Sequence, residues 1–104
     1  MPYGVVWKPA AEEDFEAIAA LNPIAASQVL DRIDRLADDP VVLARQPSFP
    51  HPLFPKYQFW IEDVDDQHHL YVTVLFSYVQ GKQDIAIEFI GRQLVPKDSP
   101  LGPS

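Results

Sequence analysis

The chain has 104 residues, 47% of them hydrophobic, and a formal net charge of −7. This length and composition predict one folded domain at residues 1–95 and a disordered tail at residues 96–104. The sequence contains no cysteine, which excludes disulfides and thiolate metal sites, and its acidic charge argues against general binding to a phosphate backbone.

The first 40 residues predict a strand followed by two helices. Residues 4–7, GVVW, form a short apolar run typical of a strand. Pro9 suits the first position of a helix, and the acidic residues after it suit the positive end of the helix dipole. Asn22 and Pro23 predict the cap and start of a second helix, which ends at Asp39 because a proline follows. We therefore expect a helical hairpin.

A proline-rich loop separates these helices from a sheet. Residues 41–56 contain four prolines, which argue against regular structure there. The loop is longer than usual, so it either carries function or packs as a rigid crossover on the core. After it, apolar residues alternate with polar ones over residues 57–61 and again over residues 70–78, as expected for strands. Between these two strands, a turn carries four acids, Glu62, Asp63, Asp65 and Asp66.

The last strand is predicted to follow a second hairpin turn at residues 80–83. Ile85, Ile87 and Phe89 are expected to face inward, with Glu88 and Arg92 on the other face. The strand is expected to end at Gly91. The predicted fold class is α+β, in the order β-α-α-β-β-β, with a helical hairpin packed on a small antiparallel sheet.

Four stretches of this chain resemble the RelE/ParE superfamily of toxins from type II toxin–antitoxin systems. They are VVWKPAAEEDFEAI, VLDRIDRLADDP, HLYVTVLFSYVQGKQDIAIEFIGRQL and the pair Gly91-Arg92. The resemblance implies a RelE/ParE-like fold and a toxin-like component that a cognate antitoxin neutralises. In that family the antitoxin places a helix in an apolar groove and often adds a strand at a sheet edge.

The resemblance is less complete at the positions that carry chemistry. Ribonuclease members cleave mRNA on the ribosome with basic residues on the sheet, and the corresponding positions here are Gln58, Trp60, Glu62 and Thr73. None of these is basic, whereas Arg92 matches the family's arginine after the last strand. Cations are needed to hold the charge that develops on the phosphate. A gyrase-type target or reduced activity is therefore one hypothesis, and whether the chain is an enzyme stays open.

A second hypothesis is a ribosome-dependent mRNA endoribonuclease with a rearranged site. Its candidate catalytic residues are Arg45, His51, Lys56 and Arg92. His68 and His69 are adjacent on a strand and should point to opposite faces, so they are not expected to form one site. We expect no metal and no cofactor.

A third hypothesis is a non-catalytic protein-interaction module. The candidate residues for binding an antitoxin or another partner are Phe15, Leu36, Trp60 and Tyr71. Trp60 lies on the polar face of its strand, where it either forms an exposed apolar patch or is buried under the proline-rich loop. The first residues lack the pattern of a secretory signal and no segment is apolar enough to cross a membrane, so we expect a cytoplasmic protein. The oligomeric state stays open.

Overall fold

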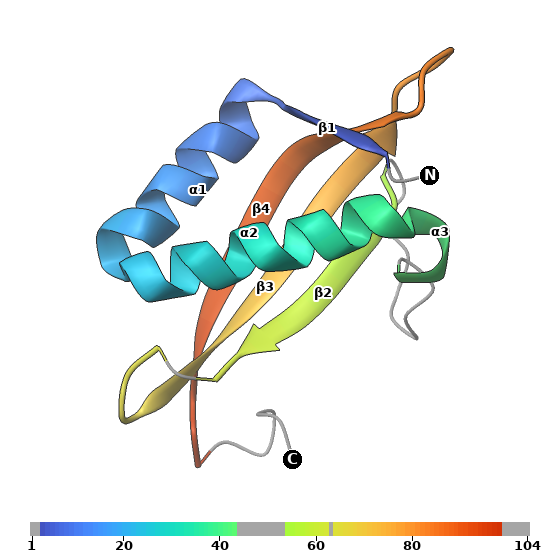
Figure 1. Cartoon of the computed structure of the whole chain (residues 1–104). Helices are drawn as coiled ribbons and strands as arrows, with labels where there is room; N and C mark the ends of the chain where they lie inside the picture. Colours follow the sequence, from blue (N-terminus) through green and yellow to red (C-terminus); the bar gives the residue numbers. More distant parts are fainter. Residues whose placement is uncertain (1–2, 44–53, 63, 99–104) are drawn as a thin grey trace.

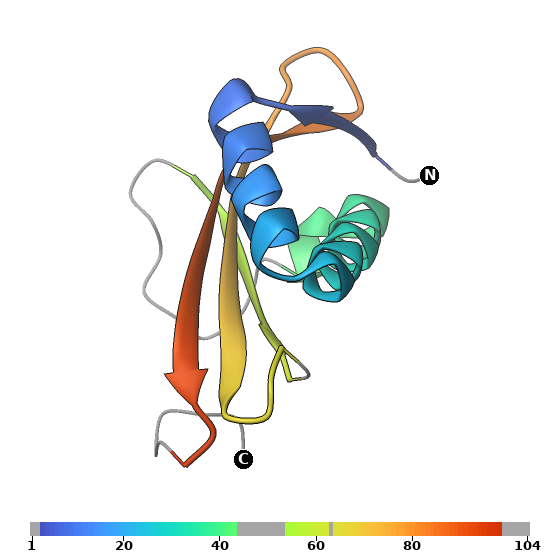
Figure 2. The ribbon, with the colours of Figure 1, turned by 90° about the vertical axis from the view of Figure 1, so that its left-hand side faces the viewer.

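The computed structural model describes residues 3–43, 54–62 and 64–98, and it has an α+β fold. Two long helices cover one face of a four-stranded sheet, and no helix or strand of the described ranges covers the opposite face, which we call the open face (Figures 1 and 2). The elements in chain order are β1 (Gly4–Trp7), α1 (Pro9–Leu21), α2 (Pro23–Asp38), α3 (Pro40–Leu43), β2 (Lys56–Ile61), β3 (His68–Tyr78) and β4 (Asp84–Pro96).

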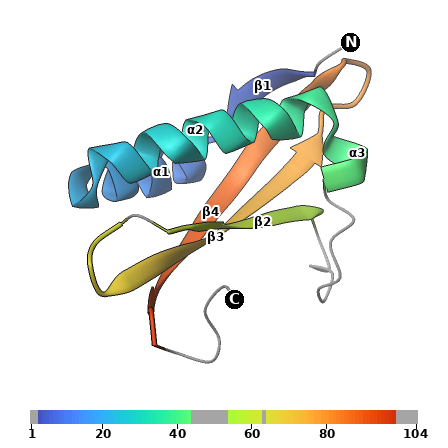
Figure 3. The ribbon, with the colours of Figure 1, turned by 60° about the horizontal axis from the view of Figure 1, so that its bottom comes forward.

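The four strands lie in the order β1-β4-β3-β2. β2, β3 and β4 form an antiparallel meander, as predicted. β1 instead runs parallel to β4, with Gly4 opposite Asp84 and Trp7 opposite Ile87, so the expectation of an antiparallel sheet is wrong for this strand (Figure 3). Alternation of apolar and polar residues identifies a strand but carries no information on the direction of its partner.

The predicted helix boundaries are confirmed. Asn22 is the N-cap of α2, and its Oδ1 accepts hydrogen bonds from the backbone N–H of Ile24 (2.9 Å) and of Ala25 (3.1 Å). Its Nδ2 donates to the carbonyl of Val64 at 2.8 Å, which ties the junction of the helices to the turn between β2 and β3. The short α3 was not predicted, and it places three residues of the expected irregular loop, 41–43, in a helical turn.

The core lies between the helices and the covered face of the sheet. Its fully buried large side chains are Ile18, Val29, Ile33, Leu36, Ile61, Leu70, Val72, Val74, Phe76, Ile85, Ile87 and Ile90. No polar or charged residue of the described chain is buried. None of the described helices combines the length and the apolar character that crossing a membrane requires.

A β-bulge in β4 changes which residues face the helices. Leu75 pairs with Phe89, but Phe76 pairs with Ile87, so Glu88 is an extra residue in β4. An extra residue reverses the alternation beyond it. Consequently Phe89 is on the open face and is 46% exposed, whereas Ile90 is in the core. The prediction that Phe89 faces inward is therefore wrong.

The same bulge moves Arg92 to the side of the sheet that carries the helices. Arg92 pairs with Val72, and Val72 pairs with Phe59, which is part of the core under the helices. The prediction of Arg92 on the other face is therefore wrong as well. β4 also continues past Gly91, which pairs with Thr73, to Pro96, because the residues after this glycine pair with β3 without interruption. Residues 99–104 of the predicted tail lie outside the described residues.

Candidate protein-binding site

A pocket with a volume of about 410 Å³ opens where β1 meets the two long helices. Its lining residues come from β1, α1 and α2, and they are Trp7, Glu12, Phe15, Glu16 and Leu30. Three of these side chains are apolar and two are carboxylates. Because ligand and partner sites are typically concave and apolar with a few polar groups, this pocket is the first candidate for a functional surface.

The apolar part of the pocket follows from the alternation of β1 and the stripe of α1. Val5 and Trp7 are the half-buried residues of β1, and both pack against the core. The indole of Trp7 meets the ring of Phe15 edge to face, with the ring centroids 5.6 Å apart. This geometry is favoured for aromatic pairs because the edge of one ring is positive and the face of the other is negative. Leu30 of α2 adds an apolar side chain that is 42% exposed.

The rim of the pocket is acidic. Glu12 and Glu16 are four residues apart on α1, so they lie on the same face of that helix, with Phe15 beside them. Both are exposed, and neither has an ion-pair partner among residues 3–43, 54–62 and 64–98. Two carboxylates beside a tryptophan and a phenylalanine favour a partner group that is apolar along its stem and cationic at its end, such as arginine or lysine.

A second cluster of aromatic rings lies on the open face of the sheet. Trp60 of β2 pairs with Tyr71 of β3, and the ring centroids are 4.6 Å apart. The imidazole of His69 meets Trp60 edge to face at 6.2 Å. All three residues are half-buried. Trp60 and Tyr71, two of the partner-binding candidates, are therefore neighbours on this face. The proline-rich residues 44–53, which were considered as a cover for Trp60, lie outside the described residues.

The middle of the open face carries no charge in the described part of the chain. Strand pairing places Gln58, Trp60, Tyr71, Thr73, Gly91 and Gln93 there. Gln58 donates from Nε2 to Oγ1 of Thr73 at 3.3 Å, so these two polar groups satisfy each other. Gln58, Trp60 and Thr73, three of the positions that the sequence resemblance matched to basic residues, thus lie together on this face as neutral side chains.

Of the four candidate catalytic residues, the structure describes Lys56 and Arg92, and these two lie on opposite sides of the sheet. Lys56 pairs with Leu75 and lies on the open face, whereas Arg92 lies on the helix side of the sheet. A sheet thus separates the two cations. Arg45 and His51 lie outside the described residues.

The partner-binding candidates lie in three different environments. Phe15 lines the pocket beside Trp7, and Trp60 and Tyr71 lie on the open face. Leu36 is fully buried in the core, so its prediction as a surface contact does not agree with its position. The helical spacing that made Leu36 a candidate is also the spacing of a core residue.

Sequence reasoning missed four residues of the pocket, namely Trp7, Glu12, Glu16 and Leu30. Glu12 was explained by the dipole of the first helix, which accounts for its type but not for its place beside an aromatic pair, and Glu16 was not considered. One signal was available: the four-residue spacing puts both acids on one face of the helix, next to Phe15.

The acidic turn between β2 and β3 is held together by one of its own carboxylates. Oδ1 of Asp65 accepts from the backbone N–H of Gln67 and of His68, both at 2.7 Å. The Nδ1 atom of His68 is 3.1 Å from the same carboxylate. The hydrogen bond from Gln67 is the largest cause that lowers the pKa of Asp65 below its usual 3.8; desolvation, the next largest, opposes it, and the contacts with His68 lower the pKa further. At least one acid of the turn, Asp65, therefore stabilises the conformation of the turn itself.

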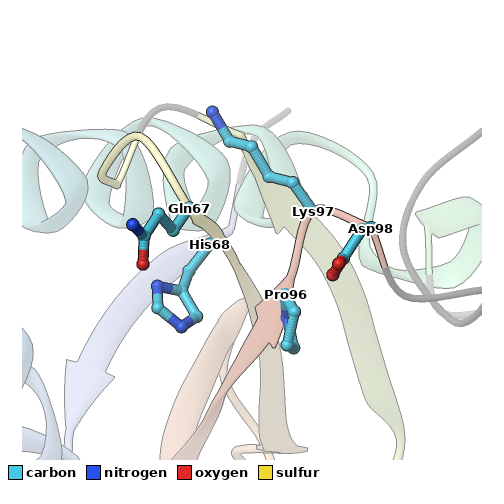
Figure 4. Close-up of a pocket in the computed structure, with 5 residues that line it drawn as sticks. All are labelled: Gln67, His68, Pro96, Lys97 and Asp98. Atoms are coloured by element: carbon cyan, nitrogen blue, oxygen red, sulfur yellow. The ribbon is translucent and has the colours of Figure 1, made fainter.

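His68 also lines a polar pocket with a volume of about 430 Å³ at this end of the sheet, where the backbone N–H of Lys97 donates to the Gln67 carbonyl at 2.9 Å. Figure 4 shows the lining residues Gln67, His68, Pro96, Lys97 and Asp98, with the ammonium group of Lys97 pointing away from the imidazole of His68. His68 and His69 have different neighbours, as their positions on a strand predicted.

No metal centre is assembled in the described ranges, because they contain no cluster of three or more histidines, cysteines or acids in metal-binding geometry. Comparison of the chain with protein families, with curated proteins and with solved structures finds no match.

Proposed function

We propose that this chain is a toxin-like component of a type II toxin–antitoxin pair, acting in the cytoplasm and neutralised by a cognate antitoxin. The resemblance to the RelE/ParE superfamily supports the proposal, and the packing of two helices on one face of a sheet is compatible with it. The observation that carries it is the pocket at Trp7, Phe15 and Leu30, an apolar surface of the kind that binds a protein segment.

The chemistry of the pocket predicts the character of the antitoxin segment. Its floor favours a large apolar side chain, and its rim of Glu12 and Glu16 favours a lysine or arginine about one helical turn away. A short amphipathic helix with one apolar and one basic position has this pattern.

The target that fits best is a protein, such as DNA gyrase. Attack on mRNA requires cations that hold phosphate, but the middle of the open face is neutral and the sheet separates Lys56 from Arg92. Reduced toxicity is the alternative within the same proposal.

Induced expression without an antitoxin tests the proposal. We expect growth to slow, gyrase supercoiling to fall and translated transcripts to stay intact, and we expect the product of a neighbouring reading frame to restore growth. Normal growth without any effect on translation or supercoiling would remove the toxin claim. Transcripts cut during translation would show that mRNA, and not gyrase, is the target. If the Arg92→Ala protein still cuts them, Arg92 takes no part in that cleavage.

Charge reversal tests the pocket itself. The double variant Glu12→Lys, Glu16→Lys should weaken antitoxin binding at least about tenfold, because it removes attraction and adds repulsion at the rim. The double variant Glu13→Lys, Asp34→Lys changes the net charge by the same amount at exposed positions outside the pocket and should bind normally. Equal weakening by both variants would assign the effect to net charge and not to the pocket.

A non-catalytic interaction module is the second candidate function, and the Trp60–Tyr71 cluster favours it. Paired aromatic rings on a neutral face are typical of the centre of a protein interface. If Trp60→Ala abolishes binding of the neighbouring gene product while expression of the wild-type chain never affects growth, this candidate replaces the toxin.

A further inference from the structure

β4 is paired on both edges along only its first four residues. β1 pairs with Asp84–Ile87, whereas β3 pairs with β4 as far as Pro96. Among the described residues, no strand pairs with the other edge of residues 91–95, which continue below β1 in Figure 1. An unpaired edge presents N–H and C=O groups that can bind another strand.

The direction of each backbone group along this edge follows from two hydrogen bonds. The Ile87 carbonyl accepts from Lys8 N–H at 3.1 Å, on the β1 side. After the bulge, the N–H of Ile90 points outward and donates to Oδ2 of Asp14 at 2.9 Å. Because successive residues of a strand alternate, the N–H and C=O groups of Arg92 and Leu94 also point outward.

Asp14 therefore satisfies the first outward N–H beyond β1, and the next two have no partner among the described residues. The edge also lacks the usual protection against pairing. Arg92 is the one charged residue in the segment from Gly91 to Val95, and Leu94 is 43% exposed. Only at Pro96, which has no N–H, does the sequence stop a further strand.

We propose that a second copy of this chain pairs with residues 91–95 of β4, antiparallel and around a two-fold axis at Gln93. The two sheets then form one continuous sheet across the contact. In this register Arg92 of each copy lies opposite Leu94 of the other, and the outward N–H and C=O groups of these residues form about four hydrogen bonds. The neighbouring register centred on Arg92 places two guanidinium groups face to face and is disfavoured.

The two-fold register and the balanced local charge fit a second copy as the occupant, and the small buried area makes the contact reversible. The charged residues near the edge are balanced in sign, with Arg92 and Lys97 against Asp14 and Asp98, so the edges do not repel each other locally. The net charge of −7 on each copy opposes the contact at longer range. Because short paired edges bury less than about 1,200 Å², the dimer should be transient, with a dissociation constant on the order of 100 μM.

The experiment measures self-association and edge protection in the wild-type chain. Sedimentation between about 20 μM and about 1 mM should show a monomer–dimer equilibrium that added salt tightens. Hydrogen exchange followed by nuclear magnetic resonance should show the amides of Arg92 and Leu94 becoming slower to exchange as concentration rises. A chain that stays monomeric, or amides whose exchange does not depend on concentration, would overturn the proposal.

A matched pair of edge lysines locates the contact. Leu94→Lys should weaken association at least about tenfold, because the lysine would lie opposite Arg92 of the other copy and like charges on paired strands repel each other. Val6→Lys places the same charge on the exposed side of β1, which pairs with Asp84–Ile87 and lies outside the proposed contact at residues 91–95, and should associate like wild type. Loss of association in Val6→Lys alone, or protection of these amides only when the neighbouring gene product is added, would assign the edge to another contact and overturn the proposal. The wild-type exchange data decide the question even if Leu94→Lys fails to fold.

Discussion

The two faces of the same sheet have opposite chemistry. On the covered face Val72, Val74 and Phe76 of β3 are fully buried beneath the helices. On the open face Tyr71 alternates with them along the same strand and packs on Trp60, half-exposed and without charge around it. Neighbouring residues of one strand thus lie in the core on one side and on a candidate binding surface on the other, so substitutions on the two faces should have different effects.

The largest expected effect compares one phenylalanine on each face. Phe76→Ala should lower the free energy of unfolding by roughly 3–5 kcal/mol, because it removes a fully buried ring and leaves a cavity. Phe89→Ala should cost less than about 1.5 kcal/mol, because its ring is half-exposed on the open face, where it contacts Phe54. Urea unfolding measures both values, and equal losses would contradict the assignment of the two faces.

Two leucines of α2 sharpen the same comparison within the helical layer. Leu36→Ala should cost roughly 2–5 kcal/mol in urea unfolding because the side chain is fully buried. Leu30→Ala should cost less than about 1 kcal/mol, since its side chain is already partly in water, but should weaken partner binding at the pocket. A Leu36→Ala protein that is as stable as wild type but fails to bind its partner would indicate that Leu36 is a surface contact and would contradict its assignment to the core.

Local signals account for what the sequence predicted well. Pro9, Asn22 and the Asp39-Pro40 pair act through backbone geometry and capping within a few residues, and the helices begin and end where they predict. The turn at residues 80–83 follows from Gly81, whose φ of 77° lies in the left-handed region that glycine favours. These features need no knowledge of distant contacts.

Contacts between distant segments account for what the sequence could not predict. One extra residue, Glu88, reverses the faces of Phe89 and Arg92, and alternation alone does not reveal where a strand contains such a bulge. The pocket combines Trp7 with Leu30, which are far apart in the sequence and meet only through packing. Its residue types were visible, but their proximity was not.

Substitutions of Asn22, at the junction of α1 and α2, test how much the attachment of the helices to the sheet contributes to the free energy of unfolding. Asn22→Ala should cost about 1–2 kcal/mol, because α2 loses its cap and the carbonyl of Val64 loses a donor. Asn22→Asp keeps an acceptor for the two N–H groups but removes the donor, so its loss should be smaller. Equal losses in thermal or urea unfolding would place the whole effect in the bond to Val64.

The smallest expected effect is on the acidic turn that joins β2 to β3 at one end of the sheet. Folding lowers the pKa of Asp65 below 3.8, mainly through the hydrogen bond from Gln67. Its contribution to stability is therefore fully present above about pH 4 and is lost as pH falls through the lower pKa of the folded state. Asp65→Asn should be slightly less stable than wild type at pH 7, and the two should converge as pH falls below 3.8.

Asp66→Asn is the matched control for this pH dependence, since Asp66 is an exposed acid of the same turn with no side-chain hydrogen bond in the described part of the chain. Its unfolding midpoint in urea should follow that of wild type across the same pH series. Added salt should shrink the Asp65→Asn difference, because the carboxylate is exposed and its attraction to His68 is screened. A difference of constant size at every pH would mean that the shape of the side chain, and not its charge, orders the turn.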